Sequence, residues 1–200
     1  MSRMKKLVLP IVALLALSGC SSTAGVAAVV GERVISVNDV QKSTNDVIAE
    51  RNKLKIQGDQ NLADLSRTQF RFHMLSAVVD TVAEKSDITI TEAEIDARHR
   101  AIRDQLGGED ALASAMANAS ISRADFPRYL RDVIIEDKIA TKFGAVGISD
   151  AEKGQVVQAV LQKTLEALKV NVNPRYGTLN TSKLDVENLD TTGGSAFQLK

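Results

Sequence analysis

Hydrophobic positions follow two different spacings along this chain, and the shorter spacing comes first. The runs Val26–Val30 and Arg33–Ile35 are rich in β-branched residues and are separated by Gly31 and Glu32. A two-residue connection with Gly first is typical of a tight hairpin turn, because Gly adopts positive φ without strain. The pattern predicts a small β-hairpin over these residues.

Beyond the hairpin, apolar residues recur every three or four positions, as in helices that bury one face. Four such stretches begin with a Ser or Thr and an acidic residue three positions later, a pairing that caps the free amides of a helix start. The pairs are Ser36 with Asp39, Thr91 with Glu94, Ser122 with Asp125, and Ser149 with Glu152. We expect Asp125 itself to be the third cap, because Pro127 then lies at the second helical position, where proline is tolerated.

Two more helices are expected between these starts. Residues 62–87 are apolar over much of the helix circumference, with Phe70 and Met74 on one of two apolar stripes. A helix that is apolar on several sides is typically central in a fold. A shorter, alanine-rich helix is expected over Asp110–Ala119 and should connect its neighbours.

The end of the chain returns to a strand-like pattern. Val170 and Val172 alternate with polar residues, and the turn sequence "NPRYG" precedes Thr178 and Leu179. From residue 180 to 200 the chain is polar, with two adjacent glycines, which predicts a mostly disordered tail. The expected fold is mainly α: a helical body over residues 26–179, with a small antiparallel sheet formed by the N-terminal hairpin and the C-terminal strand.

The first 19 residues have the layout of a secretory signal peptide: a basic start, an apolar run and a small-residue exit. The apolar run Leu7–Leu17 is shorter than the roughly 20 residues that a transmembrane helix needs. Leu17 to Cys20 resemble the bacterial lipobox, in which the cysteine receives a diacylglycerol and becomes the new N-terminus. Cys20 is the only cysteine and cannot form an internal disulfide, which favours this interpretation.

A lipid at Cys20 predicts a location on a membrane, facing the extracytoplasmic side. Several acyl chains, palmitate among them, hold a protein on a bilayer, whereas one chain is marginal. Residues 20–25 then form a short tether, and residues 21–25 reach only about 17 Å, so the folded body lies close to the membrane. The inner membrane, the outer membrane and the surface of a single-membrane cell all remain open.

Charge narrows the classes of partner. Three of the 25 basic residues precede Cys20 and none of the 25 acidic ones does, so the mature chain has a net charge of −3. This mildly acidic, mixed-sign chain offers no basic stripe for nucleic acid. Aromatic residues make up 4% of the chain and Trp is absent, which disfavours a carbohydrate-binding face.

No catalytic, metal-binding or cofactor-binding pattern is found. The two histidines, His73 and His99, are far apart, and the sequence contains neither a phosphate-binding glycine loop nor a Gly-x-Ser-x-Gly elbow. His73 lies between two apolar stripes and is expected to be a hydrogen-bonded core residue. His99 lies inside a capped helix without oriented partners in the sequence. We therefore expect no enzyme activity and no cofactor.

Three segments together resemble a family. The hairpin "VVGERVISVNDV", the helix "TEAEIDARHRAIRDQLGG" and the helix "ISRADFPRYLRDVIIEDKI" resemble the N-terminal chaperone module of the SurA and PrsA type of exported foldase, and also the peptide-binding helical part of trigger factor. The resemblance covers Val26–Leu179. Val30 stands where the family commonly has Asn, and the chain has no room for the parvulin-type prolyl isomerase domain that follows in many relatives.

The resemblance implies an ATP-independent chaperone, a holdase, whose partners are unfolded or partly folded exported polypeptides. Its apolar binding surface is expected on two helices and the start of a third. The candidate peptide-binding residues are Leu112, Met116, Phe126, Phe70 and Met74. A non-catalytic accessory lipoprotein with one dedicated envelope partner is the alternative, and a foldase related to peptidyl-prolyl isomerases is the third. The oligomeric state is left open.

Overall fold

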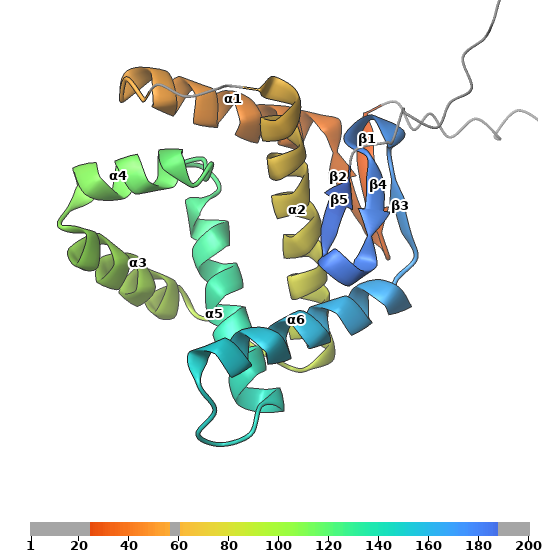
Figure 1. Cartoon of the computed structure of the whole chain (residues 1–200). Helices are drawn as coiled ribbons and strands as arrows, with labels where there is room; N and C mark the ends of the chain where they lie inside the picture. The colour runs from red at the N-terminus through yellow and green to blue at the C-terminus, as the bar shows by residue number, and fades with distance from the viewer. Residues whose placement is uncertain (1–24, 57–60, 188–200) are drawn as a thin grey trace, which may run out of the picture.

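The computed structural model describes residues 25–56 and 61–187. The signal peptide, Cys20 and residues 188–200 lie outside this part of the chain. Within it the protein is mainly helical, with two small antiparallel sheets (Figure 1). The helices are α1 (Val37–Lys53), α2 (Leu62–Lys85), α3 (Glu92–Leu106), α4 (Glu109–Asn118), α5 (Phe126–Phe143) and α6 (Asp150–Ala167). The strands are β1 (Val26–Val30), β2 (Arg33–Ser36), β3 (Val170–Val172), β4 (Thr178–Asn180) and β5 (Asp185–Glu187), and two 3₁₀ turns, η1 (Pro174–Tyr176) and η2 (Thr181–Lys183), flank β4.

The first sheet joins the two ends of the folded body, as the sequence predicts. β1 and β2 form the expected hairpin, and β3 pairs with the other side of β1 in the order β2-β1-β3. Gly31 has φ +61°, which the tight turn requires. Its amide also donates a hydrogen bond to the carbonyl of Lys169, with an N···O distance of 3.0 Å. The hairpin is therefore tied to the segment between α6 and β3 as well as to β3.

The prediction of a disordered tail from residue 180 is wrong for residues 180–187. β4 does not join the first sheet but pairs with β5, and Leu184 and Val186 are each only 7% exposed. Leu184 has φ +51°, which turns the chain back toward β4. Two apolar side chains are enough to hold this polar stretch on the folded body, because both pack on the main core. The folded body thus extends to Glu187.

α2 is the central helix, as predicted. It packs against α1, α5, α6 and the first sheet (Figure 1), and Phe70, Met74 and Val78 are completely buried in the main core. The ring of Phe70 stacks on that of Tyr176, with 4.5 Å between the ring centroids. The predicted core role of His73 is also confirmed, because its Nε2 lies 2.9 Å from the hydroxyl of Ser43.

The four helix starts form as the capping pairs predict. Thr91 and Ser149 each form a reciprocal capping box, and the hydroxyl of Ser36 accepts a hydrogen bond from the backbone amide three residues later. Asp125 occupies the cap position of α5 and Pro127 its second helical position, but the Asp125 side chain forms no capping hydrogen bond. Local side-chain chemistry therefore marks the starts of α1, α3 and α6.

α3 and α4 form an arm beside the N-terminal part of α5. No residue of α3 is buried, and the arm is held by a second small apolar cluster of Leu112, Met116, Phe126 and Leu130. In Figure 1 this arm lies on the opposite side of α5 from the sheets. The arm is thus a lightly packed extension of the main body.

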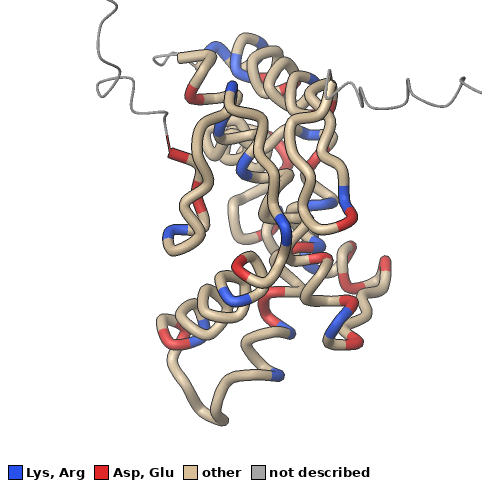
Figure 2. The backbone as a smooth tube through the Cα atoms, turned by 90° about the vertical axis from the view of Figure 1, so that its right-hand side faces the viewer, with Lys and Arg blue, Asp and Glu red and all other residues tan. Residues whose placement is uncertain are grey.

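Charges are mixed over the surface. In Figure 2, acidic and basic positions are interspersed along the chain, and this view shows no stripe of one sign. In the residues that the structure describes, no helix combines the length and apolar character needed to cross a bilayer.

Candidate functional site

An apolar hollow of about 320 Å³ lies between α3, α4 and α5, and we call it the arm groove. Its floor is made by Leu112 and Met116 of α4 and by Phe126 and Leu130 of α5. Each pair is spaced by four residues, so both side chains of a pair lie on one face of their helix. Three of the predicted peptide-binding residues are thus brought together.

The floor residues are well covered, with exposed fractions between 1% and 8%. These side chains line the groove, but most of their surface is covered because they also pack on one another. Little of the apolar floor is therefore open to solvent. Ile95 of α3 forms the opposite wall and is partly buried. Movement of α3 would uncover more of this apolar surface.

Polar contacts tie α3 and the residues before it to α5. The Lys138 ammonium lies 2.5 Å from the Glu94 carboxylate and donates a hydrogen bond to the carbonyl of Thr89. The Lys138 ammonium and the hydrogen bonds from Thr91 lower the pKa of Glu94 to about 2. Arg98 forms an ion pair with Asp137 of α5. Exposed ion pairs contribute little each. The side chains of Ile95 and Ile102 also pack against the apolar cluster, so both polar and apolar contacts hold α3.

The rim of the arm groove is acidic. Glu92 and Asp96 lie one turn apart on α3, and Glu109 faces them from α4. Glu109 lies 3.9 Å from the His99 ring nitrogen and 4.0 Å from the Arg103 guanidinium. The rim therefore carries more negative than positive charge around an apolar floor.

Aromatic rings connect the arm groove to a neighbouring apolar hollow of about 300 Å³. The ring of Phe126 stacks near that of Tyr129, with 6.2 Å between centroids. The rings of His99 and Phe126 are nearly perpendicular, with 5.4 Å between centroids. Tyr129 lines the second hollow together with Phe72 and Ile121. The first turn of α5 thus presents apolar surface on both sides.

Phe70 and Met74, predicted to bind peptides, lie elsewhere. Both are fully buried in the main core, and neither lines the arm groove. Their stripe on α2 is covered by neighbouring helices and by Tyr176, which the sequence pattern of one helix could not reveal. These two residues are core residues, and their assignment to a binding surface is corrected.

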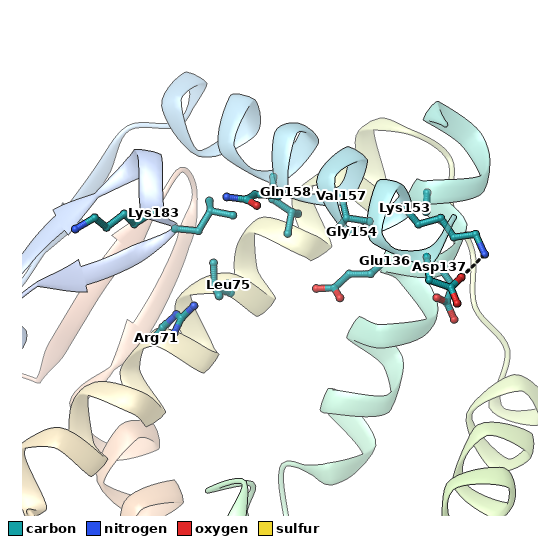
Figure 3. Close-up of a pocket in the computed structure, with 13 residues that line it drawn as sticks. Arg71, Leu75, Glu136, Asp137, Lys153, Gly154, Val157, Gln158 and Lys183 are labelled. Carbon is teal, nitrogen blue, oxygen red and sulfur yellow. Dashed lines mark hydrogen bonds and ion pairs between the residues drawn. The ribbon is translucent and has the colours of Figure 1, made fainter. Parts of the chain in front are cut away.

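A polar cavity of about 580 Å³ lies between α2, α5, α6 and η2. In Figure 3, Glu136 extends from α5 toward α2, where Arg71 and Leu75 face the cavity. Burial, together with the charges of Asp132 and Asp137, raises the pKa of Glu136 to about 7. Burial also raises the pKa of Asp132 to about 6.

Sequence reasoning missed the Asp132–Glu136 pair. Two acids spaced by four residues on the face of α5 that also carries Ile135 and Ile139 were the available signal. Within residues 25–56 and 61–187, no group of three or more His, Cys, Asp or Glu side chains is arranged to hold a metal ion.

Comparison with known proteins identifies the N-terminal segment. Residues 4–21 match the model of the prokaryotic membrane lipoprotein lipid attachment site, a segment that includes Cys20. No curated protein and no solved structure matches this chain. The attachment site is that of a bacterial lipoprotein anchored to a membrane through lipid at Cys20.

Proposed function

We propose that this lipoprotein is an ATP-independent holdase that binds unfolded exported polypeptides outside the membrane. The observation that carries the proposal is the arm groove, an apolar hollow whose outer wall, α3, has no buried residue. The proposal also draws on the likeness of the hairpin and helices to the SurA and PrsA type of chaperone module.

The chemistry of the groove suits varied apolar side chains. Its volume of about 320 Å³ is at the lower end of the range for ligand pockets, roughly 300–1,000 Å³. Met116 in the floor is flexible and polarisable, which helps a surface adapt to different partners. Leu112 and Phe126 supply fixed apolar area beside it.

The place of the groove suits capture of chains near a membrane. The described chain begins at Gly25, whose carbonyl accepts a hydrogen bond from the amide of Val37 at the start of α1, 2.7 Å away. In Figure 1, the α3 and α4 arm is on the other side of the molecule from the strands where this start lies. Only a short tether separates Gly25 from Cys20, which would keep the folded body and its groove close to the bilayer on the extracytoplasmic side.

We propose binding without catalysis. His99, whose flanking sequence superficially matches the opening of a parvulin strand, lies on helix α3, and its nearest partners are the Phe126 ring and Glu109. No nucleophile or second histidine accompanies it among the groove residues. The holdase is expected to act stoichiometrically and without accelerating proline-limited refolding.

Light scattering tests the proposal. The soluble chain starting at Ser21 is added to a chemically unfolded model protein, and aggregation is followed beside an inert control protein. We expect suppression that scales with its concentration. Met116→Ala should weaken suppression several-fold, whereas Val146→Ala, at a fully exposed position outside the groove, should not. Circular dichroism checks that both variants are folded.

Absence of suppression by the folded wild-type chain would overturn the holdase. It would favour the accessory lipoprotein with one dedicated partner, and capture of that partner from the cell envelope would be the next measurement. Accelerated refolding of a proline-limited substrate would instead favour the third alternative, a foldase related to prolyl isomerases.

A further inference from the structure

The cavity between α2, α5, α6 and η2, shown in Figure 3, has apolar walls as well as charged ones. Its volume of about 580 Å³ lies within the range of small-molecule sites, roughly 300–1,000 Å³. The apolar part of its lining consists of Leu75, Ala140, Val157, Leu161 and Leu184. The cavity therefore has room for the apolar body of a small ligand.

The three basic residues of the lining all have acidic partners. The ion pairs are Arg71 with Asp185, Lys153 with Asp150, and Lys183 with Glu187. These bases are therefore largely neutralised, and the cavity offers little positive charge to an anionic ligand.

Glu136 is the acid of the lining that has no basic partner. Its side chain extends from α5 toward α2 in Figure 3 and forms no ion pair or hydrogen bond among the described residues. The other two acids of the lining are paired: Asp137 with Arg98, and Asp150 with Lys153. The unpaired charge of the cavity is thus the carboxylate of Glu136.

The surroundings of Glu136 lack a cation. Burial and the negative charges of Asp132 and Asp137 raise its pKa, and among the described residues no basic group lies close enough to lower it. Asp132, one helical turn away, is 8% exposed, and its Oδ1 has no hydrogen-bond partner in the described part of the chain. A cation beside Glu136 would stabilise its ionised form.

Gly154 leaves open space in the wall that α6 contributes. It lies inside the helix that begins at Asp150, where glycine is less favourable than alanine. A Cβ atom at this position would meet no atom within 4 Å. The packing of the described residues gives no reason for glycine here, whereas a ligand in the cavity would use the space.

We propose that this cavity binds a small molecule that carries an ammonium group on an apolar body. The ammonium group contacts the carboxylate of Glu136, and the apolar body packs on Leu75 and Val157. The site lies apart from the arm groove and does not depend on the proposed holdase function.

Fluorescence anisotropy tests the proposal. The chain contains no Trp, so an indole probe is followed without a Trp background. Three probes share the indole ring and differ in their end group: tryptamine has an ammonium, tryptophol a hydroxyl and indole-3-acetate a carboxylate. With the mature chain carrying Cys20→Ser at about pH 8, we expect tryptamine to bind about tenfold more tightly than tryptophol, because hydrogen bonds between charged groups are the stronger ones. Indole-3-acetate should bind most weakly.

Glu136→Gln assigns the preference to this carboxylate. The variant should bind tryptamine no more tightly than tryptophol, whose own affinity should stay unchanged. Binding of tryptamine by the wild-type chain should weaken several-fold as the pH falls below the Glu136 pKa of about 7, and the variant should lack this dependence. Glu166→Gln, at an exposed acid on α6 outside the cavity, should keep the preference. Persistence of the preference in Glu136→Gln would overturn the assignment.

Gly154→Leu tests the place of the ligand. Leucine is a good helix former, so α6 should stay folded while its side chain occupies the cavity and weakens binding of every probe. Ala159→Leu, at an exposed position of the same helix outside the cavity, should leave binding unchanged. Circular dichroism checks that both variants are folded, and unchanged binding by Gly154→Leu would overturn the site.

The remaining outcomes are also decisive. Equal binding of the three probes, or tightest binding of indole-3-acetate, would overturn the ammonium preference. Absence of tryptamine binding by the folded chain would overturn the site itself. None of these results changes the aggregation assay, which tests the holdase separately.

Discussion

The hydroxyl group of Ser76 on α2 donates a hydrogen bond to Oδ2 of Asp132 on α5. The second oxygen of this carboxylate, Oδ1, is buried and has no partner among the described residues. Arg128 and Arg131 lie near enough to favour the ionised form, and Asp80 opposes them, but burial is the largest effect. The contact between the two helices therefore includes an acid that is easier to bury when protonated.

The contribution of Asp132 and Glu136 to stability is predicted to decrease as pH rises from about 4 to about 7. Their pKa values are raised to about 6 and about 7, so in this range these two groups bind more protons in the folded state than in the unfolded state. Their part of the unfolding free energy then falls with pH, by an amount on the order of 1–3 kcal/mol. Urea unfolding at several pH values measures this slope.

Asp132→Asn should flatten that slope, because the amide stays neutral while keeping a hydrogen-bond partner for Ser76. The exposed acid Asp110, replaced by Asn, serves as the control and should leave the slope unchanged. An equally steep slope in Asp132→Asn would show that other groups cause it.

The last strand is predicted to be part of the stable fold. A chain that ends at Leu179 loses Leu184 and Val186, both of which pack on the main core. Burial of two such side chains stabilises a fold by about 3–5 kcal/mol in total. Urea unfolding should show a clearly lower midpoint for this chain than for one that ends at Glu187. Equal midpoints would mean that β5 contributes nothing to stability.

Local features of the fold could be predicted from sequence, and features that depend on distant partners could not. The Gly31 turn and the capping boxes at Thr91 and Ser149 involve residues within a few positions of each other, and all were found. The pairing of β3 with β1 is also predicted, from the strand-like patterns at the two ends of the helical body. β5 was missed because its two buried residues stand in a polar stretch whose partners lie far away in sequence.

The candidate site shows the same division. The apolar sides of α4 and α5 were predicted, and Leu112 and Met116 do line the arm groove. Met74 was misassigned because α2 is apolar on several sides, and only the packing of its neighbours decides which sides are covered. The cluster of Glu92, Glu94 and Asp96 is visible in the sequence, but its first two acids are interpreted there as a favourable helix start.

Loss of a cap is predicted to have different consequences in α3 and α6. Thr91→Ala and Ser149→Ala each remove a capping box, at a cost of about 0.5–2 kcal/mol. α3 has no buried residue, whereas α6 buries Leu161 and Leu165. Hydrogen exchange should therefore show faster local opening of α3 in Thr91→Ala with little change in global unfolding. Ser149→Ala should lower global stability.

The reverse pattern would contradict the description of the arm as a lightly packed extension of the main body. If Thr91→Ala lowered global stability as much as Ser149→Ala, the arm would unfold together with the main body. Suppression of client aggregation by the same two variants would then show whether holdase activity depends on an intact arm or on an intact main core.

Removal of the Tyr176 hydroxyl is predicted to stabilise the protein. Its oxygen is buried without a partner among the described residues, while its ring stacks on Phe70. Tyr176→Phe keeps the stacked ring and removes a polar group whose burial is unfavourable, so the unfolding free energy should rise by about 1 kcal/mol. Tyr129→Phe, at a partly exposed position, is the matched control and should change little. Urea unfolding measures the unfolding free energy of both variants. A lower value for Tyr176→Phe than for the wild-type chain would show that the Tyr176 hydroxyl makes a stabilising hydrogen bond.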